Sequence, residues 1–412
     1  MTTTALQPDV RFGTIEGGIT APRGFRAAGV ACGIKASGGL DLSLLVSDEI
    51  ASAAGVFTTN LAKAAPVLLS QDHLAQSGGR SRAVVINSGC ANACTGADGH
   101  DHARAMAALT ADAVGCDPST VLVASTGVIG VKLKIGNIER GIVDAVSQLS
   151  MSNGAAAARA IMTTDPFPKE SAIEVSSGDG RSFRVGGMAK GSGMIEPLMA
   201  TMLSVVTTDA AVAPALLQRA LKAAVDDTFN AITVDGECST NDCVFALANG
   251  ASGVELTERD WPLLVGSLKA ACEPLAIGIV RGGEGATKLV TVRVTGAASV
   301  EDARRTARAI ANSPLVKTAI HGGDPNWGRL IAVAGRAGSA FNLEKAVVRI
   351  GSLTLFADGT PYDERSAEAA DYLQGREIDV EVDLGTGGQG QSRMWTCDLS
   401  AEYVRINAEY RT

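Results

Sequence analysis

The chain has 412 residues, of which 46% are hydrophobic and 19% charged, so it is long enough to bury a substantial core without a metal or disulfide staple. A net charge of −8 argues against a nucleic-acid partner, which normally requires a basic face. Aromatic residues are only 4% of the chain, which leaves few side chains on which bases could stack.

The first 18 residues have neither a basic segment nor an apolar segment of a secretion signal, and no run of about 18 uninterrupted apolar residues follows. Eight scattered cysteines in a chain of this size are typical of free thiols in a reducing compartment. We therefore expect a cytoplasmic protein with no membrane partner.

In the first half of the chain, short runs rich in Val and Ile alternate with Ala-rich stretches, which is typical of mixed α and β layers. In chain order the pattern predicts a strand over 83–87, a helix over 101–114, a strand over 121–125, helices over 136–149 and 153–162, and strands over 171–175 and 183–188.

The second half continues the same alternation. A strand over 202–207 precedes a helix that begins at Pro214, where the missing N–H of proline would have no helical partner, and runs to about residue 228. There follow a strand over 231–235, a helix over 258–277, a strand over 288–294, a helix over 303–312, strands over 330–334 and 346–350, a helix over 364–373 and a strand over 378–382. The fold class is therefore mixed α/β.

The usual catalytic and cofactor motifs do not match. The four histidines lie outside any Gly-x-Ser-x-Gly or His-Glu-x-x-His pattern, and the glycine-rich loops fit neither a Walker nor a dinucleotide motif. Cys90 and Cys94, followed by His100 and His102, have the residue types of a zinc site but not its spacing. We predict no metal and no bound cofactor.

A more informative stretch is the run AKGSGMIEPLMATML, residues 189–203. If the Ala200–Thr201 bond were cut, Thr201 would gain an α-amino group with a pKa near 8, which could act as base to its own hydroxyl. Such a nucleophile would need no histidine. From spacing alone, however, a threonine in an apolar run is an ordinary strand residue.

The run KGSGMIEPLMATML closely resembles the self-cleavage region of the ornithine acetyltransferases, also called glutamate N-acetyltransferases. The resemblance extends over nearly the whole chain, in six further ordered segments: ASTGVIG (124–130), RAIMTTDPFPK (159–169), FNAITVDGECSTND (229–242), GEGATKL (283–289), NSPLVKTAIHGGDPNWGR (312–329) and YVRINAEYRT (403–412).

This resemblance implies that Thr201 attacks the carbonyl of Ala200 and cuts the chain into an α chain (1–200) and a β chain (201–412). Thr201 would then carry an acetyl group from N-acetylornithine to glutamate. Acetyl-CoA as a second donor stays open. The implied fold is a mixed α/β assembly of two intertwined halves, joined as an α2β2 heterotetramer.

The resemblance also implies a set of site residues. Thr126 and Gly127 match the oxyanion hole, although a simple turn after a strand is the alternative for this position. The implied substrate-binding residues are Thr164, Lys190, Thr201, Glu284, Asn407 and Thr412. Our own hypotheses are that Lys190 pairs with a substrate α-carboxylate and that Glu284 receives the ammonium of ornithine.

One departure is Cys90, where the family pattern has Asn, which leaves substrate contacts near that loop uncertain. Three alternatives stay open. They are a self-cleaving amidohydrolase or aminopeptidase that gives the acyl group to water, an uncleaved binding protein in which Thr201 is a strand residue, and a relative that serves another acyl acceptor.

Overall fold

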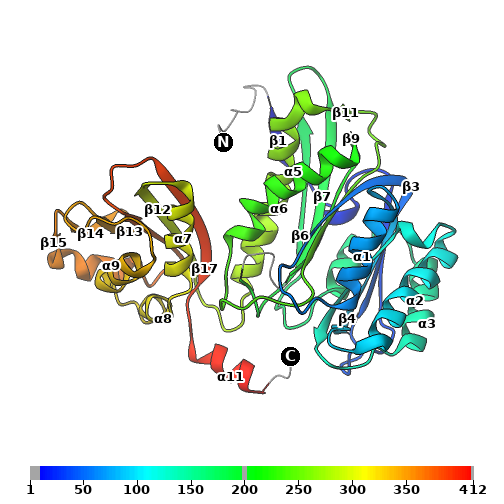
Figure 1. Cartoon of the computed structure of the whole chain (residues 1–412), viewed down its shortest axis with the longest axis horizontal. Helices are drawn as coiled ribbons and strands as arrows, with labels where there is room; N and C mark the ends of the chain where they lie inside the picture. The colour runs from blue at the N-terminus through cyan, green and yellow to red at the C-terminus, as the bar shows by residue number, and fades with distance from the viewer. Residues whose placement is uncertain (1–9, 197–201, 410–412) are drawn as a thin grey trace.

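The structure is a computed structural model that describes residues 10–196 and 202–409. Two sheets with their helices form two bodies that lie side by side, and the C-terminal helix α11 (Ala401–Glu409) lies near their junction (Figure 1). The mixed α/β class predicted from the sequence is confirmed. The predicted nucleophile Thr201, its cleavage partner Ala200 and the predicted substrate residue Thr412 lie outside the described residues.

The larger sheet has the described strand order β1-β6-β7-β8-β10-β3-β4-β5, with β2 paired to β3. Its pairs are antiparallel except β8 with β10 and β4 with β5. The strands are β1 (Arg11–Thr14), β2 (Phe25–Val30), β3 (Leu42–Phe57), β4 (Arg80–Cys90), β5 (Val121–Val128), β6 (Lys169–Ser176), β7 (Ser182–Lys190), β8 (Leu203–Thr208) and β10 (Cys243–Ala248). Two short strands, β9 (Ala211–Val212) and β11 (Glu255–Leu256), pair beside it.

The central strands of this sheet are buried on both faces; β10 is apolar throughout, and the buried hydroxyls of β8 donate to backbone carbonyls. Every residue of β8 and β10 is buried, and neighbours such as Val205 and Val206 belong to different core clusters because successive side chains point to opposite faces. The helices of this body are α1 (Ala65–Gln76), α2 (Gly96–Val114), α3 (Ile135–Ser147), α4 (Gly154–Ala160), α5 (Pro214–Asp226) and α6 (Trp261–Arg281).

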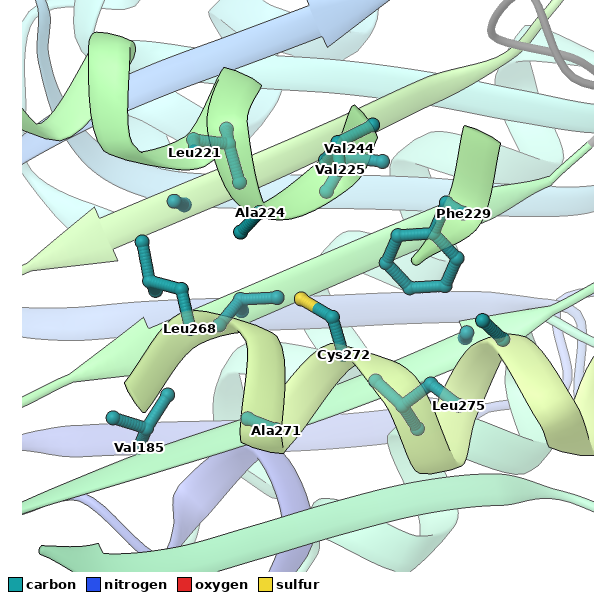
Figure 2. Packing of buried hydrophobic residues seen from close by; sticks show 14 of the residues in the cluster. Val185, Leu221, Ala224, Val225, Phe229, Val244, Leu268, Ala271, Cys272 and Leu275 are labelled. Carbon is teal, nitrogen blue, oxygen red and sulfur yellow. The ribbon is translucent and has the colours of Figure 1, made fainter. Parts of the chain in front are cut away.

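The largest core cluster packs α5 and α6 against each other and against the larger sheet (Figure 2). Leu268, Cys272 and Leu275 of α6 face Leu221 and Val225 of α5, with Phe229 closing one end of the layer. Burying such side chains contributes roughly 1.5–3 kcal/mol each relative to leaving them exposed. This layer fixes the end of α6 that leads to Glu284.

The segment Glu258–Arg281, which contains α6, is the one helix in the described part of the chain that is long and apolar enough to cross a membrane. Inside the molecule 61% of its apolar window is buried, and its buried residues pack in the cluster just described. Its apolar character is accounted for by this core.

The smaller body is built on the sheet β15-β14-β13-β16-β12-β17. In β16 exposed and buried residues alternate, as expected for a sheet with one solvated face. The elements are β12 (Leu289–Ala297), β13 (Val347–Ile350), β14 (Leu353–Ala357), β15 (Thr360–Pro361), β16 (Glu377–Asp383), β17 (Gly390–Cys397), α7 (Val300–Ala311), α8 (Pro314–Gly322), α9 (Trp327–Arg336) and α10 (Ser366–Tyr372).

Two predicted strands are wrong. Residues 330–334 lie within helix α9, where Leu330, Val333 and Ala334 are buried at helical spacing and Asn326 caps the first turn by accepting from the N–H of Arg329. In the second predicted strand, 231–235, Ala231 ends the short 3-10 helix Phe229–Ala231, and residues 232–235 form a loop with a single bridge, from Ile232 to Trp395. The loop's backbone groups bond to both bodies, so no ladder develops.

Strands from both sides of the predicted cut share the larger sheet. Strand β7 pairs along its length with β8, from Lys190 opposite Leu203 to Val185 opposite Thr208. Strand β8 in turn pairs with β10, which pairs with β3. The division at residue 200 stays a prediction, but two chains produced there would share one continuous sheet.

Candidate active site

The six candidate residues within the described ranges line one cavity of about 120 Å³. They come from distant parts of the sequence: Thr126, Gly127, Thr164, Lys190, Glu284 and Asn407. The structure therefore brings together every predicted site residue that it describes. Their chemical roles remain predictions.

Thr126 and Gly127 lie near the end of β5, beside the parallel strand β4. Gly127 has a φ of 126°, and a Cβ atom there would lie 2.6 Å from the backbone nitrogen of Cys90, so only glycine fits. The amide of Asn241 donates to the carbonyls of Ser125 (2.9 Å) and Ala91 (2.6 Å). The strand end is thus held rigidly, as an oxyanion hole requires.

Lys190 is the last residue of β7 and is only 4% exposed. Its Nζ donates to Oγ1 of Thr126 over 3.1 Å. Burial lowers the pKa of Lys190, against the attraction of Asp165, Asp242 and Glu284, which favours the charged form. The position therefore brings a desolvated amino group to the predicted oxyanion hole.

Glu284 and Asn407 meet directly on the cavity wall. The backbone N–H of Glu284 donates to the carbonyl of Ser192 over 2.9 Å, and the amide Nδ2 of Asn407 donates to Oε2 of Glu284 over 2.9 Å. Tyr403, one turn earlier in α11, donates its hydroxyl to Asp235 over 3.3 Å. Helix α11 therefore contacts the cavity wall through Tyr403 and Asn407.

Two carboxylates near the cavity, the half-buried Asp235 and the buried Asp242, were not singled out by sequence reasoning. Asp235 accepts from the N–H groups of Met194 (2.6 Å) and Ile195 (2.7 Å), and Asp242 accepts from the N–H of Met202 (2.9 Å). Burial raises the pKa of both. They therefore hold the backbone on either side of residues 197–201.

A signal for both carboxylates existed in the sequence. They lie in the segment FNAITVDGECSTND, residues 229–242, which carries part of the family resemblance. An acidic side chain that is removed from water needs a backbone or charged partner. Which backbone groups it would bind depends on the fold alone.

The cysteines and histidines do not form the site. Cys90 is buried in a core cluster, and its Sγ lies 3.2 Å from the carbonyl of Val131, so the departure at this position does not reach the cavity wall. None of the four histidines contributes to that wall in the described chain. Over residues 10–196 and 202–409 no cluster of His, Cys, Asp and Glu could hold a metal ion.

A cavity that combines a rigid strand end, the buried amino group of Lys190 and the carboxylate of Glu284 held by Asn407 is the site of an enzyme that acts on a small charged substrate. The comparisons with known proteins agree with this class. The model of the ArgJ family matches residues 26–412. The chain belongs to the ArgJ family.

Relatives of the same family match over nearly the full length. The arginine biosynthesis bifunctional protein ArgJ of Synechococcus sp. is 51% identical over 410 residues, which are 97% of this chain and 98% of that protein. The protein of the same name from Synechocystis sp. is 48% identical over 411 residues, again 97% and 98%. The predicted family is confirmed, and with it the prediction of an acyltransferase of arginine biosynthesis.

A solved structure of the arginine biosynthesis bifunctional protein ArgJ from Bacillus halodurans is 45% identical in sequence. The match covers 51% of the chain described here and 100% of the Bacillus halodurans chain, with a TM-score of 0.49.

Proposed function

We propose that the chain transfers an acetyl group from N-acetylornithine to glutamate through an acetyl ester on Thr201, after cutting itself between Ala200 and Thr201. The observation that carries this proposal is the hydrogen bond from Lys190 Nζ to Thr126 Oγ1, beside Gly127. The Glu284–Asn407 pair lines the same cavity.

Self-cleavage begins when Oγ1 of Thr201 attacks the carbonyl carbon of Ala200. The peptide C–N bond breaks, its nitrogen takes the hydroxyl proton, and the acyl group passes to oxygen. Water then hydrolyses this ester and leaves a carboxylate on Ala200 and a free amine on Thr201. Asp242 and Asp235 support this chemistry by holding Met202, Met194 and Ile195, the described backbone on both sides of the cut.

Acetyl transfer repeats this exchange with a small substrate. The Thr201 hydroxyl gives its proton to its own amine and attacks the acetyl carbonyl, and the amide bond breaks as ornithine leaves with a proton on nitrogen. The α-amine of glutamate then attacks the ester and restores the threonine. In each step the hydroxyl of Thr126 and the N–H of Gly127 would donate to the oxyanion.

The charges around the cavity are divided in a way that supports ornithine as the leaving product. Lys190 faces the predicted oxyanion hole, whereas Glu284, Asp235 and Glu237 supply carboxylates to the same wall. An ammonium at the end of a substrate side chain would be attracted to these carboxylates, and an α-carboxylate to Lys190.

Three finer points belong to this proposal. The relatives' shared name calls them bifunctional, which supports acetyl-CoA as a second acetyl donor and thus as a substrate. Two chains cut at residue 200 would share the larger sheet, which supports a heterodimeric unit that pairs into an α2β2 assembly. We place the enzyme in the cytoplasm, without a cofactor or metal.

The test of the function is a product assay. Purified protein is incubated with N-acetylornithine and glutamate, and separately with acetyl-CoA and glutamate, and both acetylglutamate and free acetate are measured. Acetylglutamate formed at the rate of ornithine release supports the transferase. Free acetate in its place would show that water is the acceptor and that the chain is an amidohydrolase.

Replacing Glu284 by Gln should raise the KM for N-acetylornithine by roughly tenfold or more, because a hydrogen bond to a charged group contributes about 1.5–3 kcal/mol. The KM for glutamate should change less, since glutamate has no side-chain ammonium. Separate half-reaction kinetics measure the two values. Equal losses for both substrates would contradict the assignment of Glu284 to the ammonium.

The matched control for this variant is Glu273→Gln. Glu273 also has a polar partner, Arg393 at 2.9 Å, but its side chain is 40% exposed and it lies outside the candidate cavity. We expect this change to leave both KM values as they are.

A further inference from the structure

A cluster of buried charges lies behind the candidate cavity. Asp165 forms an ion pair with Lys169, and the side chains of the two residues are 0% and 2% exposed. Lys190 is buried beside them, and its charge acts on both. Burying charges so completely is costly unless each has partners, so a cluster of this kind needs a reason beyond stability.

Within this cluster, the carboxylate of Asp165 accepts hydrogen bonds from several donors. Its Oδ1 accepts from Lys169 and from the backbone N–H of Gly191 over 2.7 Å, and its Oδ2 accepts from the N–H of Thr163 over 2.9 Å. Gly191 follows Lys190, and Thr164 lies between Thr163 and Asp165. One carboxylate therefore ties together two segments that each carry a predicted substrate-binding residue.

Asp165 also balances the charge of Lys190. The carboxylates that act on Lys190 are Asp165, Asp242 and Glu284, of which Asp165 has the largest effect, and the neighbouring cations are Lys169 and Lys35. Burial by itself would raise the pKa of Asp165, but Lys190, Lys169 and the N–H of Gly191 lower it to about 2. Asp165 is therefore ionised throughout the neutral range.

We propose that Asp165 is a positioning residue for acetyl transfer, which keeps Lys190 as a charged ammonium directed at Thr126 and holds Thr164 on the same cavity. This inference rests on the proposed function.

The direction of the bond between Lys190 and Thr126 explains why the charge matters. An ammonium has donors and no lone pair, so Thr126 must accept from it and its own O–H is left to donate to an oxyanion. A neutral amine has a lone pair and can accept the Thr126 proton instead. Loss of the charge on Lys190 would thus remove one donor from the oxyanion hole.

The variant Asp165→Asn tests this inference because it keeps the shape of the side chain and removes its charge. On the self-cleaved protein we expect kcat for acetyl transfer to fall by about 10–100-fold, the range for a lost bond to a charged group. Without the attraction of Asp165, Lys190 loses its proton more easily, so the basic limb of the kcat profile should move to lower pH. A purely structural role would not move that limb.

The matched control is Asp226→Asn. Asp226 also forms an i,i+4 ion pair with a lysine, Lys222 at 2.8 Å, but the lysine side chain is 67% exposed and neither residue lines the candidate cavity. We expect its kcat and pH profile to match those of the unchanged protein.

Removal of Asp165 alone leaves Lys169 buried without its partner, which could prevent folding. The double variant Asp165→Asn with Lys169→Met removes both charges and should still show a lower kcat and a basic limb at lower pH, by less than the single variant because a cation beside Lys190 is lost as well. A folded single or double variant with the original kcat and pH profile would overturn the inference. If the unchanged protein forms no acetylglutamate, the proposed function fails first, and the two failures are thereby distinguished.

Discussion

Replacing Thr201 by alanine should leave the protein as one full-length band on a denaturing gel and reduce acetyl transfer by roughly 10⁶-fold, the scale of loss when the nucleophile of a covalent mechanism is removed. Alanine has no hydroxyl, so neither the attack on Ala200 nor the acetyl ester can form. Electrophoresis measures the first effect and acetylglutamate formation the second. Two bands of nearly equal length from this variant would contradict self-cleavage by Thr201.

The control for this experiment is Thr201→Ser, which keeps the hydroxyl and the new α-amine. We expect it to cut itself and to retain part of the activity. An inactive, uncut serine variant with native thermal stability would show that position 201 requires more than a hydroxyl nucleophile.

The change Thr126→Val should lower kcat by roughly 10²–10³-fold, as is typical when one donor to an oxyanion is removed. The KM for N-acetylornithine should change much less, because the donor acts mainly on the negative oxygen of the intermediate. Valine has nearly the volume of threonine, and Thr126 is only 7% exposed, so the packing should be kept. Steady-state kinetics of the cut enzyme measure both constants.

One further variant separates the hydroxyl from the rest of the side chain. Thr126→Ser keeps the donor and should retain most of the activity. The valine variant also leaves Lys190 without the acceptor that it has in the structure, so its thermal unfolding should be followed together with its kinetics. A valine variant with unchanged kcat would show that Thr126 is not part of the oxyanion hole.

Helices and strands with clear periodicity could be predicted from the sequence, and the exceptions have physical causes. The segment 330–334 is apolar and short, and such a run does not distinguish a buried strand from a helix. Its helical structure becomes evident only from the spacing of the buried residues along the whole of α9 and from the cap at Asn326. Strand β3 was missed although it is the longest described strand, because the charged residues Asp48 and Glu49 interrupt its apolar pattern.

The same contrast applies to the site. The family resemblance identified Thr126, Gly127, Lys190, Glu284 and Asn407 as candidates, and the structure places all of them on one cavity. The resemblance could not identify the residues that hold these candidates in place. Asp165 and Asp235 act through backbone N–H groups of segments distant in sequence, and such partners exist only once the chain has folded.

The sequence by itself determined the class of fold, the family and the order of the chemistry-bearing segments, because apolar periodicity and motifs are local properties of the chain. Only the tertiary structure decided that Lys190 donates to Thr126 and that Asn407 binds Glu284. It also decided that the buried carboxylate of Asp165 binds the backbone of Gly191, next to Lys190. These contacts span from 26 to 123 positions of sequence. The bonds of Lys190 and Asp165 are buried, and burial is a property of the folded chain.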